Sequence, residues 1–192
     1  MWLRYAEDGI AVLETPPCRR TITARECKGR GDKALMALNH YYLAFPWLVF
    51  TICYNRKHHI TLHLAFRNES LRQRDQSLFY PNLWNVYHTD LRICMESVYF
   101  GYQEEETFFK AVISSFWNSA WTQSASLHDS YLKANSYSKD RRLGDAHGPN
   151  WKTWEQYSKS DPNFITTVCW PRYGVLDDLL RYARLSTKNQ SS

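Results

Sequence analysis

The chain has 192 residues, of which 44% are hydrophobic and 16% aromatic, and it carries a net charge of +5 at neutral pH. This composition excludes a disordered chain and indicates one domain with a full hydrophobic core. The longest apolar segment is interrupted by Pro46 and is too short to span a bilayer. The five cysteines are scattered without a CxxC pair, so we expect free thiols in a reducing compartment. The N-terminus lacks the basic and apolar regions of a signal peptide, so we expect a cytoplasmic protein. We expect no metal or organic cofactor.

The first third of the sequence alternates apolar segments with turn-forming residues. It predicts a hairpin over residues 2–14 around Asp8-Gly9, a basic loop over 15–33 and a short helix over 33–43. A nearly all-apolar central strand over 47–54 and an alternating strand over 60–66 follow. The basic loop holds at most a short strand at 21–24. The short helix is predicted because Leu35, Leu38 and Tyr42 recur at helical spacing.

The clearest helix is predicted over residues 104–121, where three glutamates precede a wide apolar stripe. The last part of the chain predicts a short helix over 151–159, a strand over 164–170 and an amphipathic helix over 175–185. We therefore expect an α/β (α+β) domain over residues 1–123 and a Ser- and Asp-rich linker over 124–150. Residues 151–192 are expected to form a mainly helical C-terminal extension packed on the same domain.

The stretch LFYPNLWNVYHTDLRICM, residues 78–95, places a single cysteine among polar groups that could assist a reactive thiol. A thiol that forms a thioester must be exposed, and a donor such as an Asn side chain must stabilise the oxyanion. Other groups could tune the thiol or receive a proton. The candidates are Cys94 as nucleophile, Asn85 or Asn82 as donor, and His88 and Asp90. The alternative is that this cysteine is packed as a small apolar residue.

Two further clusters have both a functional and a structural interpretation. Cys53, His58, His59 and His63 are close in sequence, but surface histidines at a turn are favoured over a zinc site. Basic residues with aromatics between them could bind nucleic acid: Arg19, Arg20, Arg25, Lys28, Arg30, Arg67, Arg72 and Arg74. Because acidic residues interleave with the second group, solvated loops are the favoured interpretation.

The order of strand, strand, Pro-Asn segment, cysteine and helix with paired phenylalanines resembles the PRTRC system protein B family, a bacterial group related to ubiquitin-conjugating (E2) enzymes. The resemblance covers about residues 45–123, at Pro46, Asn85, Val86, Tyr87, Cys94, Phe108, Phe109, Ser115, Phe116 and Thr122. The segment Tyr80-Pro81-Asn82 is also similar to the His-Pro-Asn motif of these enzymes, with Tyr in place of His. Leu91 stands near the position of a turn glycine in the family.

The resemblance implies a ubiquitin-conjugating-enzyme-like antiparallel sheet packed by helices. It also implies an E2-like carrier that accepts a ubiquitin-like protein as a thioester from a ThiF-like (E1-like) activating enzyme and transfers it to an amine. Cys94 would be the thioester acceptor and Asn85 the oxyanion donor, with Asn82 as second choice. The alternatives are a non-catalytic scaffold of the same fold, in a homo- or hetero-oligomeric plasmid, phage or mobile-element assembly, and a nucleic-acid-binding accessory protein.

Overall fold

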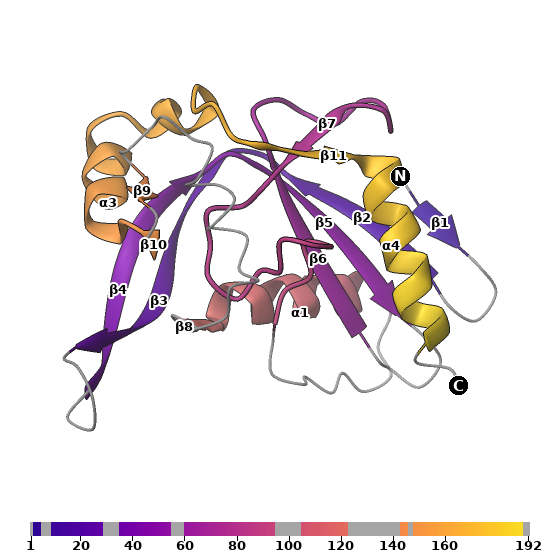
Figure 1. The fold of residues 1–192 in the computed structure, drawn as a ribbon, viewed down its shortest axis with the longest axis horizontal. Helices are drawn as coiled ribbons and strands as arrows, with labels where there is room; N and C mark the ends of the chain where they lie inside the picture. Colours follow the sequence, from indigo (N-terminus) through magenta and orange to yellow (C-terminus); the bar gives the residue numbers. More distant parts are fainter. Residues whose placement is uncertain are drawn as a thin grey trace.

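The computed structural model describes residues 2–4, 9–28, 35–54, 60–94, 105–122, 143–145 and 148–189. They form a mixed α/β fold of mainly antiparallel sheets and helices, in agreement with the predicted class (Figure 1). The strands are β1 (Trp2–Arg4), β2 (Gly9–Thr15), β3 (Cys18–Lys28), β4 (Leu35–Phe45), β5 (Trp47–Tyr54), β6 (Ile60–Arg67), β7 (Ser77–Phe79), β8 (Ala120–Thr122), β9 (Gly144–Asp145), β10 (Gly148–Pro149) and β11 (Arg172–Val175). The helices are α1 (Glu105–Asn118), α3 (Trp151–Ser160), the 3-10 helix η2 (Pro162–Thr166) and α4 (Leu176–Asn189).

Strands β2 to β5 form one long antiparallel hairpin that takes part in two sheets. β2 pairs with β5 and β3 with β4 in a single register, because Thr15 lies opposite Leu48 and Cys18 lies opposite Phe45. Prolines at positions 16, 17 and 46 mark the passage between the sheets, since proline cannot donate a hydrogen bond to a strand ladder. One half of the hairpin belongs to the sheet β1-β2-β5-β6-β7-β11. The other half, the β3–β4 arm, extends away from that sheet and pairs in parallel with β8 (Figure 1).

Helix α1 joins the two sheets through aromatic contacts. The Phe116 ring lies edge-on to Phe50 of β5 and to Trp121 of β8, with ring centroids 4.9 and 5.1 Å away. The Trp117 ring meets Phe45 of β4 at a centroid distance of 5.1 Å. Because Phe116 is fully buried between both sheets, α1 fixes the β3–β4 arm relative to the six-stranded sheet.

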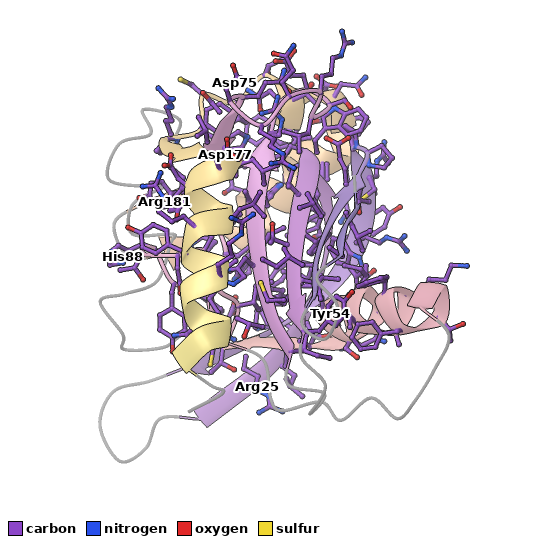
Figure 2. All side chains as sticks on the ribbon, turned by 90° about the vertical axis from the view of Figure 1, so that its right-hand side faces the viewer. Arg25, Tyr54, Asp75, His88, Asp177 and Arg181 are labelled. Carbon is purple, nitrogen blue, oxygen red and sulfur yellow. The ribbon has the colours of Figure 1, made fainter. Side chains whose placement is uncertain are left out.

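Helix α4 packs against strands β5 and β6 on the other face of the six-stranded sheet. Figure 2 shows α4 on one side of these strands and α1 on the other. The side of α4 that faces the sheet is apolar and buried, and consists of Leu176, Leu179, Leu180 and Ala183.

Within the described residues, no helix combines the length and the apolar character that crossing a membrane requires.

Helix α3 covers the outer edge of β4 with hydrogen bonds from its side chains. The Tyr42 N–H donates to the Glu155 carboxylate at 2.9 Å, and the Ala44 N–H donates to the Ser158 hydroxyl at 2.8 Å. The Trp154 indole N–H donates to the Ala44 carbonyl at 2.9 Å. These contacts satisfy main-chain groups that an edge strand would otherwise leave open.

The predicted helix over residues 33–43 is wrong, because these residues mostly belong to β4. Burial alternates along the strand: Tyr41 and Leu43 are buried, whereas Leu38 and Tyr42 are exposed. The basic loop predicted over 15–33 is also wrong over most of its length, since it contains the partner strand β3.

The predicted strand over 164–170 is a third error, because η2 occupies its first half and the rest is irregular. The strands over 47–54 and 60–66 and the helices over 151–159 and 175–185 are confirmed. The predicted helix over 104–121 is confirmed as far as Asn118, after which β8 begins. The β1–β2 hairpin forms, but Gly9 is paired with Arg4 and so does not belong to the turn. The residues expected as an extension contribute α3 on β4, β11 beside β7, and α4 on β5 and β6.

Candidate functional site

A short hairpin of residues 85–94, which we call the Cys94 hairpin, carries the candidate nucleophile. Two main-chain hydrogen bonds hold its strands together, from the Tyr87 N–H to the Arg92 carbonyl at 2.8 Å and from the Cys94 N–H to the Asn85 carbonyl at 2.7 Å. Asn85 and Cys94 are therefore directly opposite each other, although the whole turn separates them in sequence. The structure thus brings the main chains of the predicted acceptor and the predicted oxyanion donor together.

The second strand of the Cys94 hairpin lies along the edge of β6. The Ile93 N–H donates to the Leu62 carbonyl at 2.7 Å, and the Leu64 N–H donates to the Leu91 carbonyl at 3.0 Å. Leu91 and Ile93 are buried, whereas the next residue, Cys94, is exposed. The interpretation of Cys94 as a packed small apolar residue therefore does not hold.

Burial separates the cysteines whose side chains the structure describes. Cys94 and Cys169 are exposed, Cys18 is half-buried and Cys53 is buried. Burial raises the pKa of the Cys53 thiol to about 12, so that this thiol stays protonated at neutral pH. Burial also raises the pKa of Cys18, and the nearby Arg20 opposes that shift. By accessibility, Cys94 and Cys169 are the candidates for reaction with a large partner.

The side chain of Asn85 is held by the main chain of Thr122, the last residue of β8. With the carboxamide assigned by its partners, its nitrogen donates to the Thr122 carbonyl at 2.9 Å and its oxygen accepts from the Thr122 N–H at 3.2 Å. The Asn85 backbone is left-handed, with φ of 57°, a conformation that asparagine adopts more readily than most residues. Both residues belong to the motif that carries the family resemblance, and the structure shows them in contact.

Asn82, the alternative donor, lies in the core. It is fully buried, and its Nδ2 donates to the Leu143 carbonyl at 2.8 Å. The same carbonyl accepts the main-chain N–H of Asn150, the N-cap residue of α3, also at 2.8 Å. The amide of Asn82 therefore connects the Pro-Asn segment to the start of α3 and is not directed at Cys94.

His88 and Asp90 lie in the turn at the closed end of the Cys94 hairpin, while Cys94 lies at its open end. The Asp90 carboxylate accepts the Arg92 N–H at 3.1 Å and lies 3.8 Å from Nε of the same residue. The structure therefore does not bring these two predicted proton carriers to the thiol.

The histidine beneath this turn, His63 of β6, is fully buried, so its assignment as a surface histidine is wrong. Its Nδ1 is 2.8 Å from the Asp90 carbonyl, which accepts the ring proton. Burial lowers the pKa of His63, although the interactions with Asp90 act in the opposite direction. His58 and His59 lie outside the described residues. The alternation of residues 60–66 places His63 with Thr61, opposite the face of Ile60, Leu62 and Leu64, so it gave no signal of this burial.

These features define a mixed α/β protein with an exposed cysteine at the open end of a hairpin on a sheet edge. No family model, no curated protein and no solved structure matches the chain. The resemblance to the PRTRC system protein B family therefore remains a prediction from the motif.

Proposed function

We propose that the protein is an E2-like carrier, which accepts a ubiquitin-like protein as a thioester on Cys94 and transfers it to an amine. The observation that carries this proposal is the exposed thiol next to a buried strand that is hydrogen-bonded to β6. A carrier thiol must meet both an activating enzyme and an acceptor, so it must lie on the surface and on a rigid support. Cys94 meets both requirements.

The proposed chemistry consists of two acyl transfers. In the first, the Cys94 thiolate attacks the carbonyl carbon of the thioester held by an E1-like activating enzyme, a new C–S bond forms, and the enzyme's thiolate leaves. In the second, the acceptor amine attacks the same carbon, a C–N bond forms, and the C–S bond to Cys94 breaks. The amine loses its proton to solvent as the thiolate is released. Both steps place negative charge on the carbonyl oxygen.

Asn85, whose main chain lies opposite Cys94, is the residue to which we assign stabilisation of that charge. A carboxamide nitrogen has two hydrogens, and the bond to the Thr122 carbonyl uses one of them. The second hydrogen is left as a donor, on a group whose orientation is fixed. Because loss of one oxyanion donor lowers acyl-transfer rates by about a hundredfold or more, Asn85→Ala should lower amine transfer by that order. Thr122→Ala keeps the main-chain partner of Asn85 and is the matched control.

The experiment that tests the carrier function uses Cys94→Lys, which replaces a transient thioester by a stable amide. The variant is expressed in the native host, and mass spectrometry is used to search for a small protein attached at position 94. Cys169→Lys is the matched control, because Cys169 is also exposed. We expect a conjugate at position 94 and none at position 169.

Two results would contradict this function. One is the absence of a conjugate from the folded Cys94→Lys variant, and the other is equal conjugation at position 169. Either result would favour the non-catalytic scaffold.

A further inference from the structure

The β3–β4 arm holds most of the protein's net positive charge. From Cys18 to Phe45 the sequence has six basic and two acidic residues, which leaves four of the five net positive charges in this segment. The basic residues are Arg19, Arg20, Arg25, Lys28, Arg30 and Lys33. Strand β3 alone has four basic residues and one acidic residue, and a net positive charge on an element that extends from the rest of the fold attracts polyanions (Figure 1).

Strand alternation divides the arm into an inner and an outer face. On the inner face, Ile22, Ala24, Tyr41 and Leu43 are buried. On the outer face, the register places Arg19 opposite Ala44, Thr21 opposite Tyr42, Thr23 opposite His40, and Arg25 opposite Leu38. The exposed side chains of this face are Arg19, Thr21, Arg25, Leu38, His40 and Tyr42. Basic residues therefore lie near both ends of the face, with aromatic rings between them.

Two acidic side chains that the structure describes at the arm, Glu26 and Glu155, are held by hydrogen bonds or an ion pair. None of the outer-face positions between residues 19 and 25 or between 38 and 44 is acidic. Glu26 belongs to the inner face, where it accepts hydrogen bonds from Asn39 at 2.8 Å and from the Tyr41 hydroxyl at 2.9 Å. Glu155 accepts the Tyr42 N–H at the strand edge and pairs with Lys159 at 3.0 Å. The charge of the outer face is therefore positive.

We infer that this outer face binds single-stranded nucleic acid, an activity separate from the carrier function of Cys94. Arg19 and Arg25 are six positions apart on one strand, a separation of about 20 Å, and contact phosphates at either end. Between them, the Tyr42 ring, 42% exposed, offers a surface on which unpaired bases stack. A duplex presents phosphates but keeps the faces of its bases stacked on each other, so the exposed ring favours a single strand.

The test is fluorescence anisotropy with the full-length protein and a labelled single-stranded oligonucleotide of mixed sequence, across a range of salt concentrations. The double variant Arg19→Ala/Arg25→Ala should weaken binding at least tenfold at low salt. It should also make the slope of log affinity against log salt shallower by about 1.4, because two phosphate contacts are lost. Tyr42→Ala should weaken binding by about tenfold and leave the slope unchanged.

The matched control is Arg181→Ala/Arg184→Ala, which removes the same charge from exposed positions of α4. It should change affinity by less than about twofold. Arg19→Lys/Arg25→Lys should keep the wild-type slope, because lysine retains the charge. Thermal unfolding confirms that every variant is folded.

Three results would overturn the inference: no binding at low salt, an equal loss in the α4 control, and tighter binding of a duplex of the same length. Binding to vesicles that contain phosphatidylserine without binding to the oligonucleotide would overturn it as well.

Discussion

Two non-glycine residues in the described chain have a left-handed backbone, and both belong to the Cys94 hairpin: Asn85 with φ of 57° and Leu91 with φ of 58°. For leucine this conformation costs about 1–2 kcal/mol. The cost is offset because the Leu91 side chain is fully buried, its N–H donates to the Tyr87 carbonyl, and its carbonyl accepts the Leu64 N–H. Backbone strain concentrated in one hairpin is typical of functional segments.

The burial of the cysteines predicts the order of their reactivity. Cys94 and Cys169 are exposed, whereas Cys53 is buried and burial raises its pKa to about 12. In the folded protein at neutral pH, a small alkylating reagent should therefore modify Cys94 and Cys169 and leave Cys53 unmodified until denaturant is added. Peptide mapping by mass spectrometry measures each site. Modification of Cys53 in the folded protein at the rate of Cys94 would contradict the structure.

His63 should make the stability of the protein depend on pH. Burial lowers its pKa below the ordinary value of 6.5, so between the two values the unfolded chain binds a proton that the folded chain does not. The free energy of unfolding should therefore decrease as pH falls through 6.5, and the contribution of His63 should become constant below the folded-state pKa.

Urea unfolding at pH 7.5 and at pH 5.5 measures this effect. His63→Asn keeps a donor for the Asp90 carbonyl and should show a smaller loss of stability between the two pH values than the wild type. His40→Gln, at an exposed position, is the control and should behave like the wild type. An unchanged pH dependence in His63→Asn would show that another group is responsible.

Among the elements, α3 stabilises the edge of β4, and the share of one hydroxyl, that of Ser158, can be measured by substitution. Ser158 is fully buried, accepts the Ala44 N–H at 2.8 Å and donates to the Trp154 carbonyl at 2.8 Å. Ser158→Ala leaves the buried N–H without an acceptor, so we expect the free energy of unfolding to fall by about 1–3 kcal/mol. Denaturant unfolding measures this change. Ser160→Ala, at an exposed position of the same helix, should change it by less than about 0.5 kcal/mol.

The elements that could be predicted from the sequence are those whose signal is local. The strand over 47–54 is apolar except for Thr51, and α1 has an apolar stripe behind its glutamates. The β3–β4 arm was missed because Leu38 and Tyr42 also fit helical spacing and because arginines conceal the alternation of Ile22 and Ala24. The structure of these residues is determined by the pairing of β3 with β4, each eleven residues long, and the periodicity of a single segment does not reveal its pairing partner.

The candidate site was predictable only in part, for a similar reason. Cys94 and Asn85 share one hairpin, so their proximity depends on residues close in sequence. The contact between Asn85 and Thr122 depends on where β8 joins β3, far away along the chain. The burial of His63 likewise depends on the Cys94 hairpin, which covers the edge of β6.

At the scale of the whole molecule, a short row of contacts connects the two proposed sites. Arg25 of β3 lies opposite Thr122 of β8, Thr122 binds the Asn85 carboxamide, and the Asn85 carbonyl accepts the Cys94 N–H. Because α1 also fixes both sheets, the arm and the Cys94 hairpin belong to one packed unit. A substitution that displaces β8 should therefore disturb both sites together.

The single register of the β2–β5 hairpin also limits which insertions and deletions the gene can accept. Successive side chains of a strand point to opposite faces, so loss of one residue reverses every residue beyond it in that strand. A deletion near Cys18 would turn Arg19 and Arg25 inward and bring Ile22 to the surface. Changes in length within either strand of the arm, Cys18–Lys28 or Leu35–Phe45, are therefore the ones that this hairpin tolerates least.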